Sequence, residues 1–134
     1  MKKLLIVILI LAIAMPAAAL AVIPDISGLS YDELAELDRQ IHLAMFSERL
    51  LGGVKIPVGN YTIGVDIPAG VYRIEVSADV GLLAIYSAEG KAVGSYVIGS
   101  VYYINEIGKI TFEDGQVIEL TYCNVMLYPY EGLF

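Results

Sequence analysis

The stretch that decides the fold is residues 57–74, which reads PVGNYTIGVDIPAGVYRI and contains one short pattern twice. The pattern is Pro, any residue, Gly, any residue, Tyr, any residue, Ile, found as PVGNYTI at 57–63 and as PAGVYRI at 68–74. Proline fixes φ and lacks an amide donor, glycine permits a tight bend, and Tyr and Ile stand two apart on one strand face. Each copy therefore predicts a turn that starts a strand. Two short copies are too few for a solenoid, so we interpret them as successive corners of a β-sandwich.

The rest of the chain beyond Val54 supports this interpretation. Runs of β-branched and aromatic residues alternate with Gly, Pro, Asn and Asp about every 8 to 12 residues, which is typical of an all-β sandwich or barrel. We expect strands at Val54–Val58, Tyr61–Val65, Val71–Ser77, Leu82–Ala88, Ala92–Ile98, Val101–Asn105, Lys109–Glu113, Val117–Tyr122 and Val125–Tyr128. Alternation predicts two sets that each share a strand face, Tyr61, Ile63 and Val65 in one strand and Tyr72, Ile74 and Val76 in another.

Three short segments have the chemistry of turns. The sequences AEGK at 88–91 and EDGQ at 113–116 place Gly where a positive φ is expected, so both predict hairpin turns. Asp66 stands before Ile67 and Pro68, where its carboxylate is expected to accept backbone amides as the chain reverses. The expected fold class is mainly β, a jelly-roll-like β-sandwich preceded by one amphipathic N-terminal helix.

That helix has a well-marked start. Ser30 and Glu33 form a capping box, in which each side chain bonds the other residue's backbone amide. We expect the helix to run from about Tyr31 to about Ser47, before the glycines at 52–53. Its apolar stripe, which either packs on the sheet or pairs with a second copy, consists of Leu34, Leu37, Ile41 and Ala44 or Met45. The opposite, polar face carries Asp38, Arg39, Gln40 and His42.

The first residues have the three parts of a secretory signal peptide. Lys2 and Lys3 precede an apolar run, and Pro16 and small residues follow it. We therefore expect residues 1–21 to be a signal peptide, residues 22–53 a linker and the helix, and residues 54–134 the β-sandwich. The alternative is an uncleaved membrane anchor, because Leu4–Ile23 is 20 apolar residues long. Either way, the expected location is secreted or extracellular, with membrane attachment only if the segment stays uncleaved.

Two segments resemble a known group of proteins. Residues 59–72, GNYTIGVDIPAGVY, resemble the Gly-x-Tyr-x-Val-Gly-x-Asp-Ile-Pro-Ala-Gly-x-Tyr signature of small β-domains in secreted or surface-attached proteins of Gram-positive bacteria. Within it, Asp66, Pro68, Gly70 and Tyr72 match the signature, whereas Ile63 and Val65 replace the usual Val and a commonly charged residue. Residues 28–34, GLSYDEL, resemble the helix start that often precedes it. The resemblance implies a compartment and a fold, and carries no activity with it.

Composition excludes several classes of function. The chain has 134 residues, a formal charge of −7, one Cys, one His and no Trp. An internal disulfide and a common four-ligand zinc site are both excluded, and the acidic balance argues against nucleic acid as a partner. Cys123 lies in the apolar stretch 120–127, where we expect a small buried hydrophobe. No catalytic motif is recognisable, so we expect no enzyme activity and no cofactor.

The remaining candidates are tyrosines and two acids. Exposed tyrosines serve in protein interfaces and stack on sugar rings, and the suggestive ones are Tyr102, Tyr103, Tyr128 and Tyr130. Asp66 and Asp79 are weak calcium candidates if they meet at one end of the sandwich. The sequence therefore predicts an exported, non-catalytic binding or interaction module at the bacterial cell surface, with an unknown protein or glycan as partner. The alternatives are a carbohydrate-binding module that uses exposed tyrosines and a structural protein that forms homo-oligomers through its helix.

Overall fold

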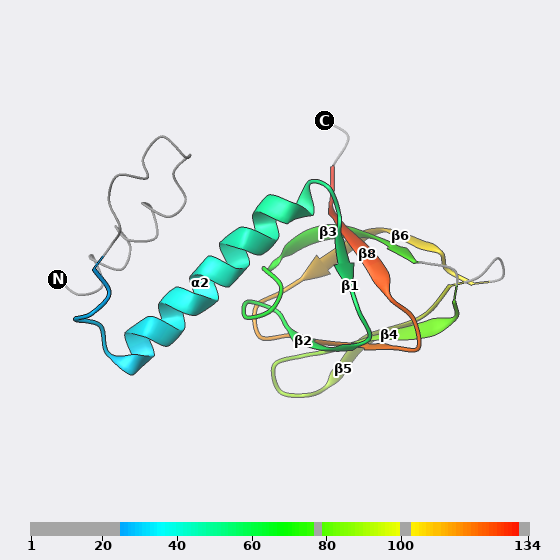
Figure 1. Ribbon diagram of the computed structural model, residues 1–134. Coiled ribbons are helices and arrows are strands. Elements are labelled where there is room, and N and C mark those ends of the chain that lie inside the picture. Colours follow the sequence, from blue (N-terminus) through cyan, green and yellow to red (C-terminus); the bar gives the residue numbers. More distant parts are fainter. Residues whose placement is uncertain (1–24, 77–78, 100–102, 132–134) are drawn as a thin grey trace.

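The structure is a computed structural model that describes residues 25–76, 79–99 and 103–131 (Figure 1). Its strands are β1 (Val54–Ile56), β2 (Gly59–Thr62), β3 (Gly70–Val76), β4 (Gly81–Tyr86), β5 (Ala92–Ile98), β6 (Glu106–Phe112), β7 (Val117–Thr121) and β8 (Val125–Pro129). They form two antiparallel sheets, sheet A with the order β1-β8-β3-β6 and sheet B with the order β2-β7-β4-β5. This is the strand order of a jelly roll, in which most connections pass from one sheet to the other. The predicted β-sandwich preceded by one helix is confirmed.

The repeated Pro-x-Gly-x-Tyr pattern builds the two corners where the chain changes sheets. The hydroxyl of Tyr61 donates to the carbonyl of Pro57 at 2.8 Å, and that of Tyr72 donates to the carbonyl of Pro68 at 2.5 Å. Each ring lies over the glycine between them, since a Cβ on either glycine would stand 3.3 Å from the tyrosine hydroxyl. The first corner leads from β1 to β2 and the second from β2 to β3, so the prediction of two successive corners is confirmed.

Strand β2 ends sooner than the sequence predicted. The amides of Val65 and Asp66 both bond to the carbonyl of Thr62, and the Asp66 carboxylate accepts the amide of Thr62 at 2.8 Å. The chain therefore reverses after Ile63, as expected for Asp66. Val65 lies in this turn, beyond the end of β2 and with 47% of its surface exposed, so the prediction that it shares a strand face with Tyr61 and Ile63 is wrong.

Two further predictions on strands and turns need correction. Residues 103–105 form no strand, and Ile104 makes only an isolated bridge to Ile98, while residues 101–102 lie outside the described part of the chain. The turn at 113–116 has the expected positive φ at Gly115, but it connects β6 in sheet A with β7 in sheet B and so closes no hairpin. The turn at 88–91 is a true hairpin between β4 and β5, as predicted.

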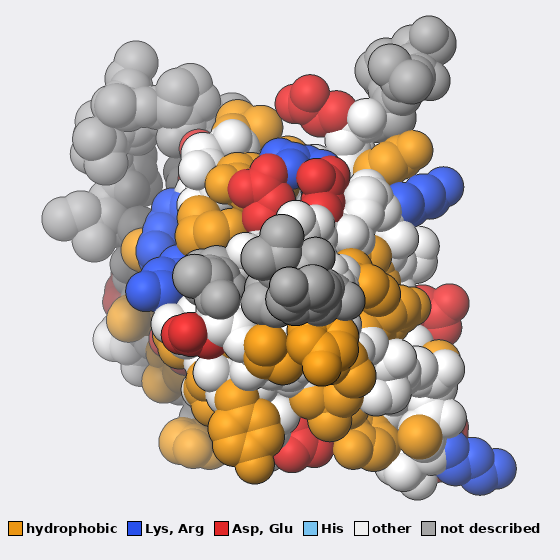
Figure 2. Space-filling model, turned by 90° about the vertical axis from the view of Figure 1, so that its right-hand side faces the viewer, with side chains coloured by type: hydrophobic (Ala, Val, Ile, Leu, Met, Phe, Trp, Pro, Cys, Tyr) orange, Lys and Arg blue, Asp and Glu red, His pale blue; other side chains and the backbone are white. Residues whose placement is uncertain are grey.

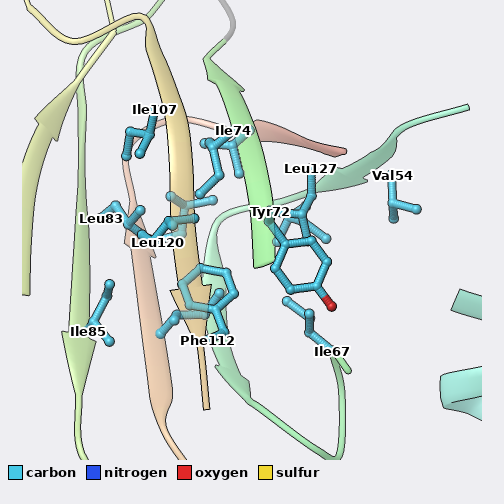
Figure 3. Close-up of a cluster of buried hydrophobic side chains, with 14 of the residues drawn as sticks. Val54, Ile67, Tyr72, Ile74, Leu83, Ile85, Ile107, Phe112, Leu120 and Leu127 are labelled. Carbon is cyan, nitrogen blue, oxygen red and sulfur yellow. The ribbon is translucent and has the colours of Figure 1, made fainter. Parts of the chain in front are cut away.

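The core lies between the inner faces of the two sheets (Figure 3). The rings of Tyr72 and Phe112 lie 5.6 Å apart at its centre, and burial raises the pKa of Tyr72 to about 12. Side chains from the two sheets face each other across this space, including Ile74, Ile107 and Leu127 of sheet A and Leu83, Ile85 and Leu120 of sheet B. Cys123 is also buried, as predicted.

Helix α2 (Tyr31–Leu50) lies beside one end of the sandwich (Figure 1). Both hydrogen bonds of the capping box between Ser30 and Glu33 are present. The predicted apolar stripe is wrong toward its C-terminal end, because Met45 is 61% exposed and the next residue, Phe46, enters the core. The spacing of apolar residues predicts which of them lie on one side of a helix, but it does not predict which of them contact the sheet.

Polar side chains of α2 make further contacts with the sandwich. Arg39 donates to the carbonyl of Gly64, and the ring nitrogen Nε2 of His42 lies 3.0 Å from the carbonyl oxygen of Asp66. This side of the helix, the predicted polar face, therefore binds the turn between β2 and β3. Among the described residues, no helix is long and apolar enough to cross a membrane, and the predicted leader at 1–21 lies outside them.

The role of the hydrogen bond from Tyr72 to Pro68 can be tested by removing the tyrosine hydroxyl. We expect Tyr72→Phe to lower the free energy of unfolding by about 1 kcal/mol, because the part-buried carbonyl of Pro68 loses its donor. Urea denaturation measures this change. The control is Tyr31→Phe on α2, where the side chain is 84% exposed and no change is expected. Equal stability of Tyr72→Phe and the parent protein would contradict a structural role for the bond.

Candidate functional site

Strand alternation brings two of the predicted tyrosines to the outer face of sheet A. Leu127 is buried in the core, so its neighbour Tyr128 points outward, and Tyr130 follows two residues later on the same face. The amide of Tyr130 bonds to the carbonyl of Val71 at 3.1 Å, which extends the pairing of β8 with β3 just beyond the end of the strand. Tyr128 and Tyr130 are therefore held in fixed positions by the backbone.

Each tyrosine has a cation over its ring. Arg73 stands directly opposite Tyr128 in the register of β3 and β8, and its guanidinium carbon lies 4.4 Å from the ring centroid. The ammonium of Lys109 lies 5.1 Å from the centroid of Tyr130. Both distances fall within the range of cation–π attraction. The outer face thus carries two aromatic–cation pairs from three adjacent strands.

Arg73 is also held by two carboxylates. Its Nη1 atom forms an ion pair with Glu75 and lies 3.9 Å from a carboxylate oxygen of Glu106. The hydrogen bond with Glu75 raises the pKa of Arg73, so the guanidinium stays charged at any physiological pH. Both ion pairs use the same nitrogen, and the described residues provide no hydrogen-bond acceptor for Nε and Nη2.

A β-bulge in β6 opens space beside Arg73. Tyr72 pairs with Ile110 and Ile74 pairs with Ile107, so the two residues 108–109 stand opposite the single residue Arg73. A Cβ built on Gly108 would meet no atom within 4 Å, and its φ is not in the left-handed region. The missing side chain at Gly108 therefore leaves space open on the outer face of sheet A. The backbone conformation there would also accept a residue with a side chain.

Together these residues surround a hollow of about 580 Å³, which we call the sheet-face hollow. It is lined by Leu51, Arg73, Gly108, Tyr128, Pro129, Tyr130 and Glu131. Gly53, in the link from α2 to β1, has a φ of +83°, and a Cβ there would come within 2.5 Å of a ring carbon of Tyr128. The end of the helix and the link after it therefore fix one wall and hold the Tyr128 ring in place.

The other predicted tyrosines do not join this site. Tyr103 precedes β6 at the opposite end of the sandwich, and Tyr102 lies outside the described residues. The end with Tyr103 exposes apolar side chains, which Figure 2 shows gathered on that side of the molecule: Val80, Val97, Tyr103, Ile104 and Tyr122. Tyr122 there has a φ of 68°, a conformation that bulky residues rarely adopt. This apolar end consists of strand ends and the loops that connect them.

The two weak calcium candidates are separated. Asp66 precedes β3 and bonds to Thr62, whereas Asp79 follows β3, so a seven-residue strand lies between them. Such a strand spans about 20 Å, too far for two carboxylates to share one ion. Within residues 25–76, 79–99 and 103–131, no group of three or more His, Cys, Asp or Glu side chains is placed to hold a metal.

Sequence reasoning missed the charged half of the site. Arg73 could have been found, because Tyr72 and Ile74 were predicted to share one strand face and the side chain between them must point to the other. Its pairing with Tyr128 could not, since the register of β3 against β8 joins residues far apart in the chain. The open position at Gly108 depends on the bulge in β6, for which the sequence offers no clear signal.

The chain matches no protein-family model, no curated protein and no solved structure. Its function must therefore be inferred from the chemistry of the sheet-face hollow and from the sequence patterns that point to export.

Proposed function

We propose that the protein is an exported, non-catalytic binding module that acts at the bacterial cell surface through the sheet-face hollow. The observation that carries the proposal is the arrangement of Tyr128, Tyr130 and Arg73 around a concave part of an otherwise regular sheet. Concave sites with aromatic walls and a few well-placed polar groups are the usual form of small-ligand sites. The leader pattern at 1–21 and the signature at 59–72 support the surface location.

The chemistry at the hollow favours binding over catalysis. Its lining residues include no serine, cysteine or histidine that could act as a nucleophile or proton carrier. The single histidine, His42, contacts the turn at Asp66, and Cys123 is buried in the core, where desolvation raises the pKa of its thiol. The two carboxylates nearest Arg73 are committed to ion pairs with it. Aromatic rings and charges paired in this way are suited to holding a ligand, and Glu131 is the one carboxylate among the described lining residues.

The proposal predicts that purified Gram-positive cell walls capture residues 22–134 through the hollow. We expect Tyr130→Ala to weaken co-sedimentation about tenfold, because a rigid aromatic contact is lost. Gly108→Leu should have a similar effect, since its side chain would fill the space left open at that position without backbone strain. The matched control is Tyr31→Ala, an exposed tyrosine on α2.

Two outcomes of the co-sedimentation would contradict the proposal. One is the absence of capture by any wall preparation. The other is equal capture of the parent protein, Tyr130→Ala, Gly108→Leu and the Tyr31→Ala control. That result would show that the hollow does not take part in binding to the wall. Circular dichroism of each variant confirms that a loss of capture does not come from unfolding.

A second candidate function, assembly through α2, is favoured by one observation. Tyr31, Leu34 and Met45 are all exposed and lie within about 60° of one another around the helix axis, because the helix turns about 100° per residue. The arc also holds the exposed Asp38, at about 20° from Tyr31, so this exposed stripe is apolar except at its middle. Exposed apolar side chains on one side of a helix are suited to pairing with a second helix. The helix-mediated structural role therefore stays a proposal beside the binding role.

Assembly predicts a change of mass when the stripe is charged. The protein is expected to have the mass of a dimer by light scattering, and Leu34→Glu with Met45→Glu is expected to return it to a monomer, since two carboxylates would be buried in the interface. Tyr103→Glu, at the opposite end of the sandwich, is the control and should leave the mass unchanged. A monomeric parent protein at all concentrations would contradict assembly through the helix.

A further inference from the structure

We infer that the sheet-face hollow recognises an uncharged saccharide, and this inference rests on the binding function proposed above. It narrows the ligand from any protein or glycan to one chemical class. The inference comes from three features of the hollow: the surfaces of its two tyrosines, the pairing of the charges around it, and the room left by Gly108.

The walls suit a ring that is apolar on its faces and polar at its edge. The pairing of β8 with β3 fixes the backbone of both tyrosines, and Gly53 and Arg73 confine the Tyr128 ring, so little freedom of that ring is lost when a ligand packs against it. Tyr130 keeps 39% of its surface exposed, while Tyr128 is more enclosed by Arg73 and Gly53. Pyranose rings present C–H groups on their faces, which contact aromatic rings, and hydroxyls at their edges.

The polar groups suit those hydroxyls. Arg73 keeps Nε and Nη2 as donors beside the hollow, because both of its ion pairs run through Nη1. Glu131, which lines the same hollow, supplies a carboxylate that accepts hydroxyl hydrogens. A sugar hydroxyl both donates and accepts, so one ring can use both groups at once.

The charge balance argues against an ionic ligand. The cations on this face of sheet A are Arg73, Lys109 and Lys55, and the carboxylates are Glu75, Glu106 and Glu131, so the group carries no positive excess. The whole chain has a formal charge of −7, which repels acidic wall polymers. A cationic sugar would meet Arg73 and Lys109 directly over the two rings. An uncharged sugar ring is repelled neither by the negative charge of the chain nor by these two cations.

The size of the hollow agrees with this class. Its volume of about 580 Å³ falls within the usual range for small-molecule sites, and the missing side chain at Gly108 keeps it open toward solvent. An open site of this kind admits an internal unit of a longer chain as well as its end.

The test is calorimetric titration of residues 22–134 with four trisaccharides. The neutral probes are maltotriose and the trimer of N-acetylglucosamine, the acidic probe is trigalacturonate, and the cationic probe is the trimer of glucosamine. We expect at least one neutral probe to bind about tenfold more tightly than both charged probes. We also expect its affinity to change less than about twofold between about 0.05 M and about 0.5 M NaCl, because no net charge is neutralised.

Variants identify the residues responsible. Arg73→Lys keeps the charge and loses the planar donor group, so we expect it to weaken neutral-saccharide binding about tenfold while the salt dependence stays flat. Tyr130→Ala should weaken binding to the same extent. Tyr103→Ala, an exposed tyrosine at the far end of the sandwich, should bind like the parent protein.

The outcomes separate this inference from the function it rests on. If cell-wall capture depends on Tyr130 but no neutral probe binds, or a charged probe binds more tightly, the saccharide inference is wrong and the binding function stands. If neither the walls nor the trisaccharides respond to Tyr130→Ala, both are wrong. Neutral binding that is lost in Tyr130→Ala and weakened in Arg73→Lys supports both.

Discussion

The antiparallel pairing of β3 with β8 is the constraint on which the rest of the structure depends. Tyr72 and Ile74 of β3 and Leu127 of β8 fill the core, and this burial allows only one register between the two strands. The same register sets Arg73 directly against Tyr128 on the outer face. A shift of one residue would bring charged side chains into the core and remove the aromatic–cation pair. Stability and the candidate site therefore have one common cause.

The corners and the helix further restrain the face of sheet A that this pairing positions. The hydroxyl of Tyr72 ties the start of β3 to Pro68, so the residue at the centre of the core also fixes where the strand starts. Helix α2 binds the preceding turn through Arg39 and His42, and the link that follows the helix packs Gly53 against Tyr128. Segments far apart in the sequence thus support one face of sheet A. The conformational freedom of the site is small because backbone pairing and core packing have already restricted it.

Local patterns in the sequence predicted the parts of the fold that local physics determines. The Pro-x-Gly-x-Tyr repeat, the capping box at Ser30 and the turn at Asp66 each depend on residues a few positions apart, and all three form as expected. Features that depend on distant partners were missed: Phe46 in place of Met45 in the core, the bulge beside Gly108, and the partner of Tyr128. Their causes lie in the sheet order and register, which no short pattern specifies.

The most direct test of this account is a proton NMR measurement of the contact between Arg73 and Tyr128. A guanidinium group held over an aromatic ring places the Arg73 Hδ and Hε protons in the shielding region of that ring. We expect upfield shifts for these protons that disappear in Tyr128→Leu, together with a cross-strand contact between the amide protons of residues 73 and 128, which face each other as a hydrogen-bonded pair. Random-coil shifts for Arg73, or an amide–amide contact that pairs it with Leu127 in place of Tyr128, would contradict the register and with it the proposed binding face.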